Sequence, residues 1–247
     1  MRRFTALPDP SQHALDDALI LLRLAVAYAG LAAVSHWAAG QIMQHLGNVL
    51  HIDTQFLVLD VLFTGLLMLG SLVIAWLLHP RDPLAWLVGH GFSPGGLVPA
   101  LLLAVTMVLI ANPLANWLDL KLPSPDLLPA DPAQPQALTP ILDLQAWRLV
   151  GAVAVATFWV PLAEEVIFRG WLFKALQRTR PGLWVALPAS TLIFALLHSF
   201  YSAGGVVVIA LLGAGLGWLR WRYDQLWLCV AAHAVYNGLT LLLVAFS

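Results

Sequence analysis

The sequence has little charge. Only 10% of its 247 residues are Asp, Glu, Lys or Arg, against roughly a quarter in soluble domains. Hydrophobic residues make up 60% of the chain, and the mean hydropathy is +0.83. This composition excludes an ordinary soluble domain and predicts a polytopic membrane protein with no nucleic-acid partner.

Cysteine and glutamate are almost absent. Cys229 is the single cysteine, which excludes an internal disulfide and a multi-thiolate metal site; we expect it to be buried in a helix. Glu164 and Glu165 are the only two glutamates, and they directly follow an apolar run, residues 149–163. A carboxylate close to hydrocarbon is costly unless it is paired or lines a wet cavity. The adjacent glutamates are therefore the first candidates for a functional site.

Long hydrophobic runs recur along the whole chain and predict an all-α transmembrane bundle of about seven helices. The expected spans are residues 18–39, 56–78, 97–118, 147–176, 183–200, 204–219 and 226–246. The fourth run is longer than a perpendicular crossing requires. Either it tilts strongly, or it ends near the glutamates and continues along the membrane surface.

Positive residues predict the orientation, because Lys and Arg near helix ends accumulate on the cytoplasmic side. With the N-terminus inside, most of them fall on the inner side, and only Lys121 and Arg148 fall outside. Seven spans then place the N-terminus in the cytoplasm and the C-terminus outside. We expect a multi-pass protein of the bacterial plasma (inner) membrane. The bacterial origin is suggested by the short, Pro-rich external loop.

Six prolines lie between residues 121 and 140 and favour an extended external linker over a helix. This linker divides the chain into two parts of one integrated membrane domain. Residues 1–145 hold three helices and the linker, which we interpret as scaffold. Residues 146–247 form a core of four helices that carries the polar motifs.

Three motifs stand on successive apolar segments of this core. Glu165 and Arg169 are four residues apart, so the arginine is the local partner of that carboxylate. Glu164 points about 100° away around the helix and must find its partners on other helices. The candidates lie in two pairs with the same four-residue spacing, Phe194 with His198 and His233 with Asn237.

Together these motifs resemble the CPBP family of intramembrane proteases, which includes CAAX prenyl endopeptidases and bacteriocin-processing or bacteriocin-immunity homologues. The resemblance covers residues 147–246 and makes the core of residues 146–247 a protease core. It implies an intramembrane endopeptidase that cleaves a peptide or protein in or near the membrane, with the lipid bilayer and a membrane-associated substrate as partners.

The resemblance also implies roles for single residues. Glu164, assisted by His198, would take a proton from the water that attacks the scissile carbonyl. His233 and Asn237 would donate hydrogen bonds to the oxyanion. Glu165 and Arg169 would hold the glutamate helix in register, and Phe194 would orient His198.

The need for a metal is left open by the sequence. The family is also described as metalloproteases, because Glu164, His198 and His233 offer three ligands for zinc or another divalent metal. We favour catalysis without a metal, since an asparagine suits an oxyanion hole better than a zinc site.

Two other functions remain open. A catalytically silent immunity or scaffold protein of the same family would keep the motifs but only bind a peptide or partner. A transporter would use buried Glu and His as a proton relay, although the sequence shows no internal inverted repeat.

Overall fold

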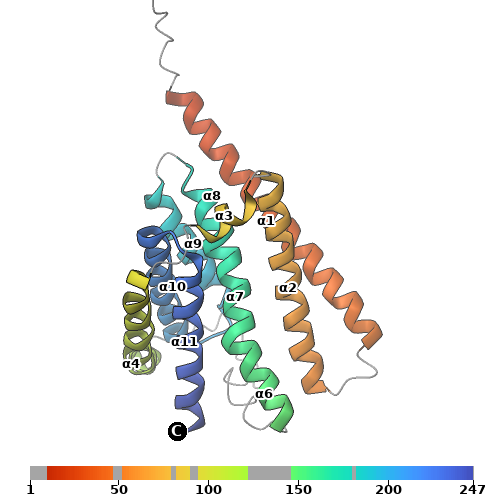
Figure 1. The fold of residues 1–247 in the computed structure, drawn as a ribbon, viewed down its shortest axis with the longest axis vertical. Helices are drawn as coiled ribbons and strands as arrows, with labels where there is room; N and C mark the ends of the chain where they lie inside the picture. Colours follow the sequence, from red (N-terminus) through yellow and green to blue (C-terminus); the bar gives the residue numbers. More distant parts are fainter. Residues whose placement is uncertain are drawn as a thin grey trace, which may run out of the picture.

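The structure is a computed structural model that describes residues 10–46, 52–78, 82–89, 94–121, 146–179 and 182–246. Figure 1 shows a bundle of long helices. The first elements are α1 (Pro10–Leu46), α2 (Ile52–Leu78), α3 (Pro83–Val88), η1 (Pro94–Gly96) and α4 (Leu97–Lys121). The elements that follow are α6 (Ala146–Ala154), η2 (Val155–Trp159), α7 (Val160–Glu165), η3 (Val166–Leu172), α8 (Phe173–Leu176), α9 (Leu183–Leu197), α10 (Ala203–Tyr223) and α11 (Leu226–Ala245).

The all-helical class predicted from the sequence is confirmed. In the described part of the chain there is no strand, only an isolated bridge between Gly89 and Gln225. Five helices there are long and apolar enough to cross a membrane, and α9 is a shorter apolar helix. The five are Leu57–Trp76, Pro94–Leu120, Leu149–Leu176, Ala203–Tyr223 and Leu226–Ala245.

All seven expected spans correspond to observed helices, with ends that differ by a few residues. The first falls within α1, which begins at the opposite end of the bundle from the end of α11 (Figure 1). The short helix α3 has no counterpart among the predictions, because six residues are too few for a hydropathy signal. The predicted proline-rich linker, residues 121–140, lies outside the described residues apart from its first.

One long helix runs through the middle of the bundle in Figure 1, and we call residues 146–176 the central helix. It passes through both glutamates without ending, so the alternative of a break beside them is wrong. Two stretches of it, η2 and η3, are π-helical. They lie on either side of α7, which carries the glutamates.

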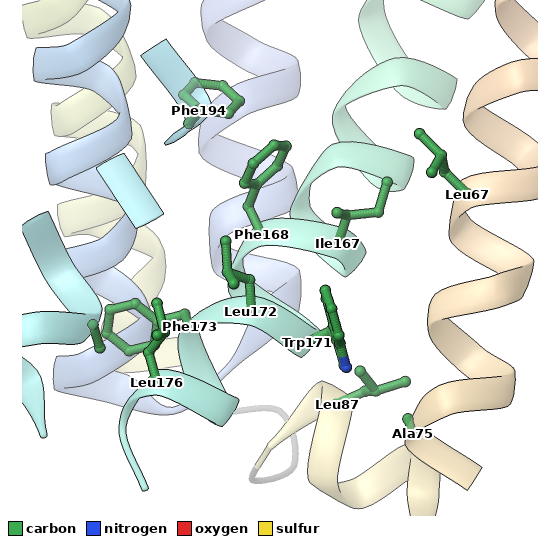
Figure 2. Packing of buried hydrophobic residues seen from close by; sticks show 11 residues of the cluster. Leu67, Ala75, Leu87, Ile167, Phe168, Trp171, Leu172, Phe173, Leu176 and Phe194 are labelled. Carbon is green, nitrogen blue, oxygen red and sulfur yellow. The ribbon is translucent and has the colours of Figure 1, made fainter. Parts of the chain in front are cut away.

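An apolar cluster joins the central helix to the N-terminal helices. Figure 2 shows Leu67 and Ala75 of α2 and Leu87 of α3 with Trp171 and other side chains of the central helix. Tyr28 of α1 stacks on Trp171, with ring centroids 6.1 Å apart. Helices α1 to α3 therefore cover the side of the central helix that α9 does not.

A second cluster joins α4, α10 and α11. Its members include Met107 of α4, Leu212 of α10 and Leu228 of α11. Gly204 permits the close approach of α10 to α4, since a Cβ there would lie 2.3 Å from the carbonyl oxygen of Ala115. The Asp119 carboxylate of α4 then accepts hydrogen bonds from Ser202 Oγ and from the Gly204 N–H, both at 2.7 Å. These contacts fix the turn between α9 and α10.

Candidate active site

The two glutamates have different surroundings although they are neighbours. The Glu165 side chain is fully buried, whereas the Glu164 side chain keeps 16% of its surface exposed. Successive helical residues point about 100° apart, so one carboxylate can enter the packed core while the other faces more open space. Only Glu164 is placed where a substrate could reach it.

The Glu165 carboxylate contacts two side chains at once, one on its own helix and one on α11. Its Oε1 atom lies 3.0 Å from Arg169 Nη1, the ion pair that the four-residue spacing indicates. The same oxygen lies 2.9 Å from His233 Nδ1 on α11. Arg169 also donates from Nη2 to the carbonyl oxygen of Gly213 on α10, at 3.0 Å. Glu165 and Arg169 thereby tie the central helix to α10 and α11.

Glu164 faces both histidines of the predicted site. Its Oε1 atom lies 3.5 Å from His198 Nε2, and its Oε2 atom lies 3.8 Å from His233 Nε2. His198 follows the last residue of α9, and His233 lies two turns into α11. Residues that are far apart in the sequence therefore meet at this carboxylate.

The second nitrogen of each ring fixes how protons are shared. His198 Nδ1 lies 2.7 Å from the Phe194 carbonyl oxygen, which can only accept, so Nδ1 carries a proton. His233 Nδ1 faces the Glu165 oxygen that also accepts from Arg169, and therefore donates as well. In neutral rings both Nε2 atoms are then bare. They can take up a proton or share one with Glu164.

Phe194 is the packing centre behind these groups. Its ring centroid lies 4.7 Å from that of His198 and 6.0 Å from that of His233. The Arg169 guanidinium carbon lies 4.5 Å from the Phe194 centroid, a cation–π contact. Phe194 is 1% exposed. Its ring and its carbonyl oxygen both contact His198 and restrict the orientation of that ring.

Asn237 lies one turn after His233 on α11, and its amide is partly engaged. Nδ2 donates to the carbonyl oxygen of Ala156 on the central helix at 2.9 Å. An asparagine NH2 group has two N–H bonds, so a second donor is available. This contact was not foreseen from the sequence.

The donor types suit zinc, but their arrangement does not. A carboxylate and two imidazoles are ordinary zinc ligands, and each ring donates from Nδ1 to an oxygen, as metal-binding histidines do. Among the described residues, however, no group of three or more His, Cys, Asp or Glu side chains is gathered so that it could hold a metal ion. The steps below are therefore derived without a metal.

Sequence reasoning missed two features of this site. The contact between His233 and Glu165 joins residues 68 positions apart and leaves no local spacing signal. Arg220, which the sequence places among the cytoplasmic charges, is fully buried and contacts the central helix. Its position near the end of an apolar helix hid this, because a buried and an interfacial arginine look alike in hydropathy.

Comparison with known proteins gives one match. Residues 146–239 match the family model described as type II CAAX prenyl endopeptidase Rce1-like. The matched part contains the central helix, α9, α10 and most of α11, and thus every predicted catalytic residue. No curated protein and no solved structure matches the chain significantly.

Proposed function

We propose, from the membership of residues 146–239 in the Rce1-like family, that this chain is an intramembrane endopeptidase in which Glu164 activates water. Members of this family are in general proteases of the CAAX type, and the chain is a membrane-embedded helical protein. The single observation that carries the proposal is the meeting of Glu164 with His198 Nε2 and His233 Nε2 inside this bundle.

The first step needs a base and a place for negative charge. A water beside Glu164 attacks the scissile carbonyl carbon and gives its proton to the carboxylate, while the bare Nε2 of His198 orients the water as a second acceptor. The carbonyl π electrons move to oxygen and form a tetrahedral oxyanion. The free N–H of Asn237 donates to this oxyanion, and so does His233 when its Nε2 carries a proton.

The second step returns the proton. The oxyanion collapses, the C–N bond breaks, and the amine leaves with the proton that Glu164 has held. The products are a carboxylic acid and an amine; the acid then gives its proton to the amine, so they leave as a carboxylate and an ammonium group, and Glu164 is ionised again. Glu165 takes no part in the proton transfer; by accepting from His233 Nδ1 it keeps the imidazole ring oriented.

The substrate class proposed is a membrane-associated peptide or protein with its scissile bond in or near the bilayer. The proposed location is the bacterial inner membrane, with the N-terminus in the cytoplasm and the C-terminus outside. Lys174 and Arg222, near the ends of α8 and α10, support this orientation. No metal is required in the proposed mechanism.

The test is a comparison of peptide termini in membranes that contain the wild-type protein or the Glu164→Gln variant. We expect at least one substrate terminus to disappear with the variant, and removal of a general base together with its charge to lower the rate by about 10²–10⁴-fold. A metal chelator should leave the wild-type cleavage unchanged. Inhibition that zinc reverses would contradict the mechanism without a metal.

His198 and His45 provide a matched pair of controls. His45 on α1 makes the same contact from Nδ1 to the carbonyl oxygen four residues earlier, at 2.8 Å, but is exposed. His198→Ala should abolish cleavage, and His45→Ala should leave it intact. If Glu164→Gln and His198→Ala both process every peptide normally, the chain is instead a binding member of the family, the immunity or scaffold alternative.

A further inference from the structure

Both π-helical segments free a carbonyl beside the glutamates. At the end of η2 the N–H of Val160 donates to the carbonyl of Val155, five residues earlier. At the end of η3 the N–H of Phe173 donates to the carbonyl of Phe168 in the same way. In each case the next carbonyl, of Ala156 or Arg169, loses the N–H that it would bind in an α-helix. A buried carbonyl in this situation needs another donor.

The carbonyl of Ala156 receives its donor from α11. Pro161 has no N–H, so the residue five positions after Ala156 cannot serve as a π-type partner. Asn237 Nδ2 donates instead, at 2.9 Å. The first π segment is thus fixed from outside the central helix.

The carbonyl of Arg169 receives its donor from α10. Arg220 Nε donates to it at 3.0 Å. The guanidinium continues to α3, where Nη1 donates to the Val88 carbonyl at 2.9 Å and Nη2 to the Leu87 carbonyl at 2.8 Å. Asp224 lies 3.5 Å from Nη2. The arginine side chain is fully buried, and its planar guanidinium donates to backbone carbonyls of both the central helix and α3.

Two glycines beside this contact have little or no room for a side chain. Gly89 follows α3 with φ at 83°, and a Cβ there would lie 1.8 Å from the Asp224 carbonyl oxygen and 2.7 Å from Arg220 Nη1. A Cβ on Gly170 would contact the side chain and the carbonyl oxygen of Leu87. The second π segment is therefore held against α3 through a single guanidinium.

The π segments determine which way the glutamates point. Each accommodates one residue more than the α-helix would, and one residue turns a helix by about 100°. If the carbonyl of Arg169 lost its external donor, a return of the segment to α-helical hydrogen bonding would give this carbonyl an N–H partner within the helix again. Glu164 would then turn relative to the part of the helix that Arg169 anchors, and its contacts of 3.5 and 3.8 Å with the histidines would break.

We propose that Arg220 is a positioning residue for the predicted protease: by binding the Arg169 carbonyl it maintains the π-helical segment that points Glu164 at His198 and His233. The expected effect of Arg220 on catalysis rests on the proposed function, whereas its expected effect on the π-helical segment does not. Arg220 does not touch the reacting atoms. It acts through the backbone of the helix that carries them.

The test uses Arg220→Lys in the full-length protein in detergent, with Arg222→Lys as the matched control. Arg222 lies two residues later on α10 and is exposed. A lysine keeps the charge but offers a single point donor, which cannot bind three carbonyls in the arginine geometry. We expect amide hydrogen exchange over residues 166–173 to change by about tenfold in Arg220→Lys, because the hydrogen bonds of this segment rearrange, and exchange over 155–160 to stay unchanged.

Cleavage of the peptide found with Glu164→Gln gives the second measurement. Arg220→Lys should lower kcat roughly 100-fold, as a misplacement of about 1 Å does, with KM little changed and the melting temperature close to wild type. Arg222→Lys should match the wild type in both measurements.

Unchanged exchange over 166–173 in Arg220→Lys overturns the proposal, and so does a loss of activity that only follows a loss of folded protein. If Arg220→Lys does not fold, Arg220→Gln replaces it, because a neutral glutamine has one NH2 group and cannot bind all three carbonyls. Exchange over 166–173 should again change and kcat should fall; no effect on either overturns the proposal. If the wild-type protein cleaves nothing, the proposed function fails, while the exchange measurement still decides the role of Arg220.

Discussion

A single oxygen atom of Glu165 serves both the arginine on its own helix and the histidine on α11. Oε1 lies 3.0 Å from Arg169 Nη1 and 2.9 Å from His233 Nδ1, and all three side chains are at most 5% exposed. In a buried site the attraction of such a group offsets the cost of desolvating it only while every partner is present. Glu165 is therefore a stability residue as well as an orienting one.

At this scale we predict that Glu165→Gln destabilises the protein by about 3–5 kcal/mol, because the Arg169 guanidinium keeps its buried charge without a counter-charge. Thermal unfolding in detergent measures the loss. The double variant Glu165→Gln with Arg169→Gln removes both charges and should recover part of the stability. A double variant that is less stable than the single one would refute this explanation.

The turn between α9 and α10 shows how one helix places a residue of another. His198 begins this turn, and Ser202 ends it by accepting from the Gly205 N–H at 3.1 Å. Asp119 of α4 binds both Ser202 and the N-terminus of α10. A carboxylate at this position also faces the positive end of the helix dipole.

At the scale of the element we predict that Asp119→Ala costs about 0.5–2 kcal/mol, the range for a lost N-cap, and speeds amide exchange over residues 198–205. Asp82→Ala is the control, since Asp82 caps α3 through the Ala85 N–H at 3.0 Å. It should lower stability by a similar amount without faster exchange at 198–205. Equal exchange there in both variants would contradict the assigned role of Asp119.

The helices were predictable from the sequence, and the family predicted from the three motifs is confirmed for residues 146–239. Long apolar runs and a four-residue spacing are local signals, so the spans and the ion pair of Glu165 with Arg169 could be found. The π segments, the contact of His233 with Glu165 and the burial of Arg220 depend on tertiary packing. Pro161 was the one local hint, since a proline inside a helix must leave a carbonyl without its donor.

The described part of the bundle has one apolar cluster around the central helix and another between α4, α10 and α11, and neither is made by the family-matched part alone. One contains Leu67 of α2 and Leu87 of α3, and the other contains Ala100 and Met107 of α4. The division into residues 1–145 and 146–247 stays a prediction. The packing shows that α4 contributes to the same core as α10 and α11.

At the scale of the whole molecule we predict that Gly204→Ala is destabilising by about 1–3 kcal/mol, as in other cases of overpacking, because its Cβ would collide with the backbone of Ala115. Gly40→Ala in α1 is the control. A Cβ there meets no atom within 4 Å, so the helix propensity of alanine should stabilise the protein by up to about 1 kcal/mol. Melting temperatures that shift in the same direction would contradict this view of the α4 and α10 packing.

The guanidinium of Arg220 donates its hydrogen bonds on α3 and the central helix to carbonyl oxygens, those of Leu87, Val88 and Arg169. Every amino acid supplies the same carbonyl, so this contact sets no requirement on the side chains of residues 87 and 88, although the Leu87 side chain itself packs in the apolar cluster. Distant relatives should therefore share a buried arginine at the corresponding place on α10 while showing no recognisable motif on α3. A search for residues that vary together with this arginine would miss the contact, because a backbone carbonyl is the same for every residue type.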